Sequence, residues 1–300
     1  MEPPMRIKER LKALIQGVLA SVYERYPTPL LKAQTDDKVA QLILQHQFRA
    51  EFRATRTARD FRDVGFRQYS QCEEDGILLY LFSLIPPQTR RCLEVCAGDG
   101  MECNTANLIL NHGWSGWLFD GDAQKVQRGQ EYYRAHPDTA VHPPTFSQGW
   151  ITAENINQLV ADAGLRGPID LLSLDLDGND YWIWKALEVV DPVVVVCEVH
   201  NPVPPDVAVT MPYDPAFNLD SFANDFRGVS LAGMVSLGRE KGYRLVGTHR
   251  HGFNAFFIKR GIAEEIFPER PASACTTDDY SQLAQRTRWP KVKDKPWVHV

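Results

Sequence analysis

The stretch Arg91–Gly100 (RCLEVCAGDG) decides the fold that this sequence predicts. Its first six residues form a β-type run, and the small residues after them form a turn at the head of a helical tract. Roughly twenty residues later a second β-type run, Gly116–Asp120 (GWLFD), ends in an acid. The predicted order is a strand, a turn of small residues, a helix, and a second strand that ends in an acid. Folds that bind a nucleoside-bearing cofactor have this arrangement.

From residue 91 onward, β-type runs alternate with helical tracts, which is typical of an open sheet covered by helices on both faces. The runs 169–174 and 193–197 are nearly all apolar, as central parallel strands must be. The last two runs are separated by only six residues, so we expect them to pair antiparallel. A strand between 139 and 148 is poorly marked because Pro143-Pro144 interrupts it. The other predicted strands are 91–96, 116–120, 169–176, 193–199, 243–247 and 254–259, and the helices 103–112, 124–135, 154–163, 180–190 and 229–242.

The first ninety or so residues are predicted to be helical. Apolar residues recur at helical spacing from Ile7 to Val22, with basic residues on the other side. This amphipathic helix could dock on its own domain or meet a membrane surface, and Pro27 and Pro29 end it. Further helices are expected over 36–61 and from Glu73 to Pro86-Pro87. The N-terminal helices could also support a homo-oligomer.

Composition restricts the class of protein. With 300 residues and 44% hydrophobic content, the chain can bury a large core. The net charge of -5 gives no general case for binding nucleic acid. The six cysteines form no CxxC pair, and no apolar stretch is long enough to span a membrane. The N-terminus is not a good secretory signal, so we expect a cytoplasmic protein. We expect a helical extension (1–65), an α/β domain (66–262) and an irregular tail (263–300).

A mainly parallel, seven-stranded, Rossmann-like sheet with an antiparallel last strand is the architecture of class I methyltransferases. Five segments resemble the FkbM-type branch of the S-adenosylmethionine-dependent methyltransferases, and the match covers roughly 66–260: Gln71–Leu78, Glu94–Asn104, Gly113–Asp122, Asp170–Trp184 and Asn254–Ile258. The resemblance implies S-adenosylmethionine as cofactor. It also implies O-methylation of a hydroxyl on a sugar, glycan or secondary metabolite.

The resemblance assigns Glu94, at the end of the first strand, to the methionine ammonium group, with Gly98 and Gly100 lining the turn. Cys96 replaces the usual first glycine, which departs from the family pattern. Asp120 can accept hydrogen bonds from vicinal ribose hydroxyls, and Asp122 either competes for that role or caps the next helix. The expected cofactor residues are Gln71, Asp75, Glu94, Ala97, Gly98, Gly100, Asn104, Asp120, Asp122 and Thr152.

Several of these residues have a structural alternative. Gln71 and Asp75 precede a helix, so capping it is as good an explanation as cofactor contact. Thr152, with Trp150 and Ile151, could form an edge for adenine or simply begin a helix. These alternatives stay open on sequence alone.

In proteins with a parallel α/β sheet, the ligand-binding and catalytic residues lie beyond the carboxyl ends of the strands. Asp175 and Asp177 follow one central strand, and Glu198, His200 and Asn201 follow the next. Asp175, Glu198 and Asn201 offer oxygen ligands for Mg²⁺ or Mn²⁺, as in the metal-dependent O-methyltransferases that this arrangement resembles. Without a metal, Asp177 or His200 would act as general base. Asp175, Asp177 and His200 are therefore the expected catalytic residues, although Asp177 could also belong to a helix-start cluster and His200 could be a hydrogen-bonded loop residue.

Two other functions remain alternatives. An NAD-dependent oxidoreductase should carry Gly-x-Gly-x-x-Gly, but no third glycine follows Gly98 and Gly100. A non-catalytic binding module on the same fold is the other alternative. It is disfavoured because Glu94, Asp120, Asp175 and Glu198 stand at the ends of separate predicted strands.

Overall fold

The structure is a computed structural model of the chain, and it describes residues 27–219 and 225–300. The amphipathic helix expected over Ile7–Val22 lies outside the described residues. The chain divides into two compact units, Met1–Gln47 and Phe48–Val300, which are treated separately below. This boundary falls earlier than the expected one at residue 65.

Helix α2 (Pro27–Thr55) begins in the first unit and continues into the second. Pro27 and Pro29 open this helix, and its first turn tolerates proline because the N–H groups there have no intrahelical acceptor. The predicted tract 36–61 is helical to Thr55. Asp60 then accepts a hydrogen bond from Arg62 N and caps the 3₁₀ turn η1 (Phe61–Asp63).

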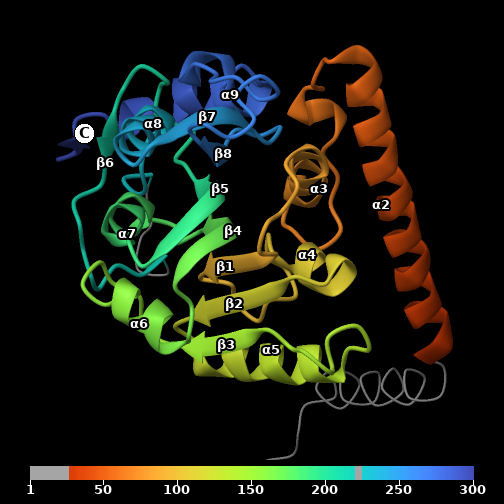
Figure 1. The fold of residues 1–300 in the computed structure, drawn as a ribbon. Helices are drawn as coiled ribbons and strands as arrows, with labels where there is room; N and C mark the ends of the chain where they lie inside the picture. Colours follow the sequence, from red (N-terminus) through yellow and green to blue (C-terminus); the bar gives the residue numbers. More distant parts are fainter. Residues whose placement is uncertain (1–26, 220–224) are drawn as a thin grey trace, which may run out of the picture. The chain divides into compact units, whose positions relative to one another are not determined.

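The second unit is built on a seven-stranded sheet in the order β3-β2-β1-β4-β5-β8-β7 (Figure 1). All neighbouring strands are parallel except β8, which runs antiparallel to both β5 and β7. The sheet therefore has the predicted mostly parallel plan with an antiparallel last strand. Its strands are β1 (Arg91–Val95), β2 (Ser115–Asp120), β3 (Thr145–Gln148), β4 (Gly167–Leu174), β5 (Val190–Glu198), β7 (Tyr243–Thr248) and β8 (Asn254–Lys259).

The central strands are buried on both faces, which explains why their sequences are nearly all apolar. Leu172 pairs with Val195 between β4 and β5, and both are fully buried. The turn between β7 and β8 is too short for a crossover helix, and the two strands form the expected antiparallel pair, with an irregularity between Leu245 and Gly247.

Helices cover both faces of the sheet (Figure 1). α6 (Ile156–Asp162), α7 (Asp180–Ala186) and α8 (Leu231–Glu240) bury apolar residues against one face, in a core with Leu93, Phe119 and Leu172. On the other side lie α3 (Glu74–Leu84), α4 (Ala106–His112) and α5 (Ala123–Ala135). α4 ends at Gly113, whose positive φ of 66° lets its N–H bond to Leu108 O.

The C-terminal segment is more regular than expected. It contains α9 (Asp279–Thr287), which Asp278 caps by accepting a hydrogen bond from Ser281 N. Its end forms β9 (Val298–His299), which pairs with β6 (Val209–Thr210) from the long connection after β5. The sequence did not predict this helix, because it is short and mostly polar, with few buried residues.

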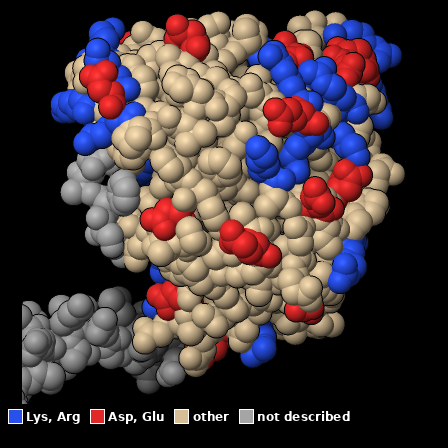
Figure 2. Space-filling model, turned by 90° about the vertical axis from the view of Figure 1, so that its left-hand side faces the viewer, with Lys and Arg blue, Asp and Glu red and all other residues tan. Residues whose placement is uncertain are grey.

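No helix among the described residues is long and apolar enough to cross a membrane. On the face shown in Figure 2, basic and acidic side chains are interspersed rather than separated into patches of one sign.

Candidate active site

The loop after β1 is held in place by Glu94. This buried side chain accepts hydrogen bonds from Asn104 N (2.9 Å, Oε1) and from Thr105 N and Oγ1 (2.8 and 2.6 Å, Oε2). Ser173 Oγ donates a further bond of 3.2 Å. Both carboxylate oxygens are thus occupied by the chain itself. Glu94 thus holds the loop, a role that sequence alone did not indicate, and its contact with a cofactor ammonium stays a prediction. Asn104 also belongs to this network, because its Nδ2 donates to Ser173 Oγ.

The backbone of the same loop turns through left-handed conformations. Cys96 has φ 64°, a region that favours glycine, so the replacement of the usual glycine keeps the expected backbone at a cost of about 1 kcal/mol. Gly100 has φ 70°, and a Cβ there would lie 2.9 Å from the Phe146 ring. A Cβ on Gly98 would meet nothing within 4 Å, so this part of the loop, next to Ala97, borders open space.

Asp120 ends β2 and joins this loop to the next helix. Its Oδ2 accepts a hydrogen bond of 2.8 Å from Gly98 N, and its Oδ1 accepts one of 2.8 Å from Asp122 N. Asp122 is the N-cap of α5, accepting from Gln124 N and Lys125 N, and these backbone bonds lower its pKa. The helix-cap alternative for Asp122 is therefore present in the structure.

A cavity of about 400 Å³ opens at the carboxyl ends of the first four strands. Cys96, Asp120 and Asp175 contribute to its wall from three different strand ends. The connection after β3 adds Trp150 and Ile151, and Trp150 Nε1 donates to Pro215 O in the long connection after β5. The remaining lining residues are Gly121, Asp122, Lys125, Gly149, Leu176, Asp177, Asn179, Phe217, Asn218 and Leu219.

Of the ten expected cofactor residues, Asp120 and Asp122 line this cavity and the other eight do not. Thr152 is not among the lining residues, and its N–H bonds to Asn155 Oδ1 at the start of α6. Gln71 lines a different cavity. Asp75 is buried beneath its own loop, where Oδ2 accepts from Ser70 Oγ and from the backbone N–H groups of residues 68–70. Asp75 lies in the first turn of α3 and holds this loop, and its contact with a cofactor stays a prediction.

A second cavity of about 290 Å³ adjoins the first, because Asp175 and Asp177 line both. Glu198, His200 and Asn201 from the end of β5 also line it, as the parallel register of β4 and β5 requires. Its other lining residues are Gln71, Val199, Arg227, Phe253, Tyr280 and Arg288. Arg227, Tyr280 and Arg288 were missed on sequence, since they come from the long connection and the C-terminal segment, where no pattern marks a site.

Three carboxylates meet at this wall: Asp175 and Asp177, which line both cavities, and Glu198, which lines the second. One oxygen each from Asp175, Asp177 and Glu198 lies within 4.8 Å of the others. Arg227 Nη1 donates to Asp177 Oδ1 at 2.8 Å. The side chains of Asp175 and Glu198 receive no hydrogen bond from a described residue. Burial, and then repulsion by neighbouring carboxylates, raises the pKa of both Asp175 and Glu198 well above the ordinary range.

Asp177 and Asp180 belong to the loop that follows β4. Asp177 has a left-handed φ of 57°, which is strained for a residue with a side chain. Asp180 is buried and holds the loop by accepting from Leu176 N (2.9 Å) and Gly178 N (3.2 Å). Burial raises the pKa of Asp180 to about 6.

His200 and Asn201 both contact neighbouring loops, and their expected catalytic and metal roles stay predictions. His200 Nε2 lies 2.8 Å from Asp225 O, and burial together with Arg227 and Arg288 lowers the pKa of His200 to about 4. The loop alternative thus describes His200, whose ring nitrogen facing Asp225 is already engaged. Asn201 Nδ2 donates to His251 O (3.0 Å), which leaves its amide oxygen as the only side-chain group able to bind a cation.

Comparisons with known proteins do not assign the chain to a family. No protein-family model and no curated protein matches the chain. Among solved structures, an S-adenosylmethionine-dependent methyltransferase from Clostridium acetobutylicum is 10% identical with a TM-score of 0.40, covering 61% of this chain and 89% of that one. Magnesium protoporphyrin IX methyltransferase from Synechocystis with bound SAM is 12% identical, with a TM-score of 0.35 and coverage of 56% and 69%. The glycopeptide N-methyltransferase MtfA complexed with S-adenosyl-L-methionine is 11% identical, with a TM-score of 0.36 and coverage of 59% and 84%.

At this level of similarity the solved structures carry no inference about activity. The strand order and the single antiparallel strand, read from the chain itself, are those of the class I methyltransferase fold.

Proposed function

We propose that the chain is an S-adenosylmethionine-dependent O-methyltransferase in which the first cavity takes the cofactor and the second takes a hydroxyl-bearing acceptor. The observation that carries the proposal is the wall shared by the two cavities, where Asp175 and Asp177 face both. Transfer of a group between two molecules needs such a meeting point at the carboxyl ends of the strands.

The charge of the first cavity favours this cofactor over one with phosphates. Its described lining contains four acids, Asp120, Asp122, Asp175 and Asp177, and a single cation, Lys125. A cationic sulfonium with an ammonium group is stabilised by such a wall, whereas the pyrophosphate of NAD is repelled. The open space beside Gly98 and the indole of Trp150 leave room for the cofactor along the strand ends.

S-adenosylmethionine, when bound, supplies an electrophilic methyl group. The chain's own contribution is to position the acceptor and to remove its proton. A carboxylate whose pKa is raised is the better base, and burial with neighbouring acids raises the pKa of Asp175 and Glu198. The hydroxyl proton then passes to one of these carboxylates as its oxygen is methylated. Asp177 is held by Arg227 and is better placed to fix the wall than to accept a proton.

The same donor set fits a hard divalent cation. Three carboxylates that repel one another and lie within 4.8 Å suit Mg²⁺ or Mn²⁺, and Asn201 lines the same cavity. We include Asp175, Asp177 and Glu198 as its ligands in the proposal. Such an ion would favour the deprotonated acceptor hydroxyl.

The resemblance to FkbM-type enzymes suggests a sugar, glycan or secondary metabolite as acceptor. Phe253 and Tyr280 give the second cavity aromatic surface next to its carboxylates, which suits the mixed apolar and polar faces of a sugar. The cofactor and the acceptor class are separate parts of the proposal and are tested separately.

Calorimetry tests the cofactor. Micromolar binding of S-adenosylmethionine and S-adenosylhomocysteine is expected, with affinity falling about tenfold in Asp120→Asn through the loss of a charged acceptor near the ribose. Asp162→Asn, at an exposed acid of α6 outside both cavities, is the matched control and should bind almost normally. Binding of NAD in place of S-adenosylmethionine would reject the proposal.

Transfer of labelled methyl groups to fractionated cell extracts would then identify the acceptor. The same assay with and without EDTA would show whether a metal is needed.

A further inference from the structure

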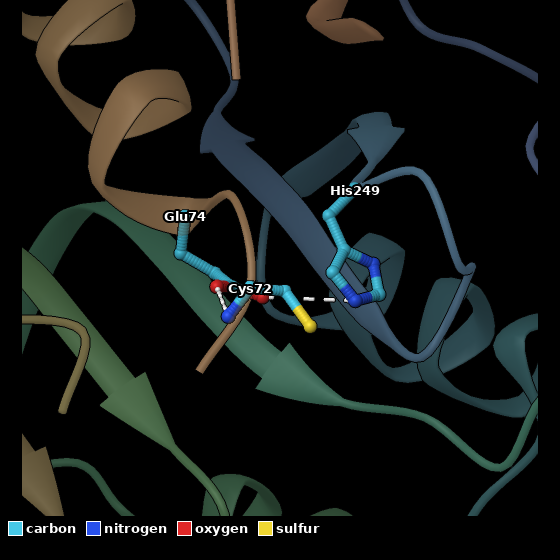
Figure 3. A group of neighbouring side chains, drawn as sticks. All are labelled: Cys72, Glu74 and His249. Carbon is cyan, nitrogen blue, oxygen red and sulfur yellow. Dashed lines mark hydrogen bonds and ion pairs between the residues drawn. The ribbon is translucent and has the colours of Figure 1, made fainter. Parts of the chain in front are cut away.

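A second group of metal-binding side chains lies away from the carboxylate wall. It consists of Cys72 and Glu74, at the start of α3, and His249, directly after β7 (Figure 3). The thiol sulfur, one carboxylate oxygen and one imidazole nitrogen all lie within 4.8 Å of one another. Glu74 and His249 are buried, whereas Cys72 is half-buried and keeps a route to solvent.

Two buried polar atoms of this group have no hydrogen-bond partner among the described residues. They are His249 Nε2 and Asn254 Oδ1, on side chains that are each 2% exposed. His249 Nε2 lies 3.7 Å from Glu74 Oε1, which is too long for a hydrogen bond. Buried polar atoms are normally satisfied, and each exception in a folded protein calls for an explanation.

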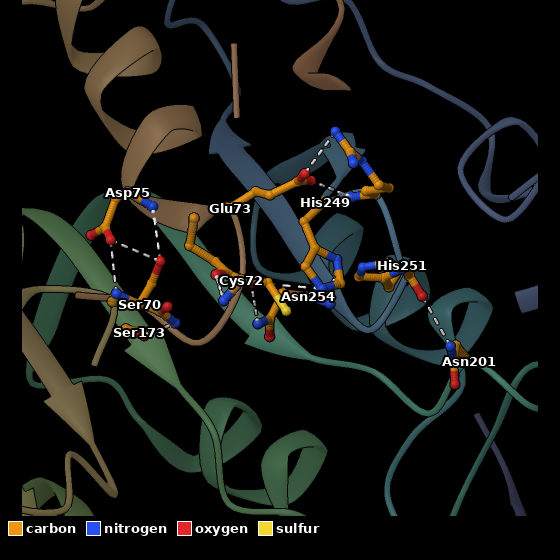
Figure 4. A network of polar contacts seen from close by, with 12 residues as sticks. Ser70, Cys72, Glu73, Asp75, Ser173, Asn201, His249, His251 and Asn254 are labelled. Carbon is orange, nitrogen blue, oxygen red and sulfur yellow. Dashed lines mark hydrogen bonds and ion pairs between the residues drawn. The ribbon is translucent and has the colours of Figure 1, made fainter. Parts of the chain in front are cut away.

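Hydrogen bonds from neighbouring residues orient the side chains of this group but leave His249 Nε2 and Asn254 Oδ1 without a partner among the described residues (Figure 4). Asn254 Nδ2 donates to Glu74 Oε1 (2.8 Å), and Cys72 N donates to Glu74 Oε2 (3.0 Å). Asn254 N donates to His249 Nδ1 at 3.5 Å, the outer limit of a hydrogen bond, so a cation at Nε2 would replace this weak contact and shift the ring proton to Nδ1. The carboxylate is held in place and the imidazole Nε2 is left facing it.

We propose that Cys72 Sγ, Glu74 and His249 Nε2 bind a zinc ion. A thiolate and an imidazole are ligands that Zn²⁺ prefers, and Glu74 supplies the third, with one donor atom of each residue within 4.8 Å of the others. Asn254 Oδ1 or a water would complete the coordination. The all-oxygen wall of Asp175, Asp177 and Glu198 suits a harder ion, so the two groups are chemically distinct.

This ion would join two parts of the chain that the sequence separates widely. It would tie the start of α3 to the β7–β8 turn, which Glu73 already contacts through an ion pair with Arg250 of 3.0 Å. Asn254 is also the register partner of Glu198 across β8 and β5. The zinc site would therefore stiffen the strand pair that carries one carboxylate of the shared wall.

Cobalt substitution tests the proposal on the full chain, stripped of metal with EDTA and kept reduced. One equivalent of Co²⁺ should produce a near-ultraviolet thiolate-to-metal charge-transfer band that Zn²⁺ abolishes. Cys72→Ser and His249→Gln should lose the band. Cys275→Ser, a thiol outside the group, and Asp175→Asn, in the oxygen wall, should keep it. Absence of the band in the parent chain, or its persistence in Cys72→Ser, would overturn the site.

Two measurements keep the test valid if a variant is destabilised. Zinc at about a hundredfold excess over its Kd should raise the Tm of the parent chain by about 5 °C or more, and should leave that of folded Cys72→Ser unchanged. In the parent chain, zinc should also slow alkylation of Cys72, read from peptide masses, by at least about tenfold while other thiols react as before. Equal alkylation with and without zinc would contradict the proposal. None of these readouts depends on methyl transfer.

Discussion

Acids serve opposite purposes in two regions of this molecule, one buried beneath loops and one half-buried at the carboxyl ends of β4 and β5. Beneath the loops, Asp75, Glu94, Asp170 and Asp180 each accept hydrogen bonds from backbone N–H groups. Asp170, for example, accepts from Gln88 N, Thr89 N and Arg90 N at 2.6–2.8 Å. At the shared wall, Asp175 and Glu198 receive no hydrogen bond from a described residue and face other carboxylates instead.

The difference teaches how to separate structural acids from functional ones. A carboxylate surrounded by N–H donors replaces the water it loses on burial, so it stabilises the loop it holds. A carboxylate surrounded by other carboxylates is destabilised until a proton, a cation or a substrate arrives. The same residue type is therefore an anchor in one region and a reactive group in the other.

The largest effect on stability is expected for Asp170→Ala. It removes the acceptor for three backbone N–H groups and the Thr89 hydroxyl, in a site that is 1% exposed. The free energy of unfolding, measured with urea, should fall by about 4 kcal/mol or more. Asp170→Asn keeps an acceptor oxygen and should lose less. Equal, small losses in both variants would show that the loop does not depend on this carboxylate.

Replacing an acid of the wall should lower activity and leave stability unchanged or higher. In Asp175→Asn, methyl transfer should fall by about 10²–10³-fold, because a base and metal ligand is lost. The free energy of unfolding should stay the same or rise, because like charges no longer repel. A drop in stability comparable to that of Asp170→Ala would remove the distinction between the two regions.

Stability should also depend on pH through the raised pKa values of the wall. Since the folded-state pKa values of Asp175 and Glu198 are raised, the native chain holds protons that the unfolded chain loses at about pH 4. The free energy of unfolding of metal-free protein should therefore decrease as pH rises from about 4 through the raised pKa values. Asp175→Asn should flatten this decrease, and Mg²⁺ should oppose it. An identical slope in the variant would contradict the raised pKa of Asp175.

The smallest effect concerns the first loop. Cys96→Gly relieves a left-handed backbone at φ 64° and should stabilise the chain by about 0.5–1 kcal/mol. Cys96→Ala retains a Cβ and should show no such gain. Matching results for the two variants in urea titrations would mean that the loop carries no strain at this position.

The sequence predicted the sheet well because its signals are local. Apolar runs such as 169–174 can only be central strands, and six residues between the last two runs allow only an antiparallel pair. Asp175 and Glu198 were also predicted to meet, because parallel neighbours bring their carboxyl ends to one edge.

The parts that could not be predicted depend on hydrogen bonds between distant segments. Nothing in the sequence around Glu94 or Asp75 shows that their oxygens are occupied by backbone N–H groups of a folded loop. Arg227 and Tyr280 reach the second cavity from segments without a regular pattern. His249 lies in the polar turn between β7 and β8, and its burial against the start of α3 could not be predicted from that composition.

The residues common to both cavities have one more consequence. Because Asp175 and Asp177 belong to each compartment, a molecule that neutralises them from one side alters the electrostatic free energy of binding on the other. Such linkage is reciprocal: the factor by which the first ligand changes the dissociation constant of the second must equal the factor in the opposite direction. In the proposed methyltransferase, the product in the second cavity and S-adenosylmethionine in the first would then change each other's affinity without any movement of the backbone.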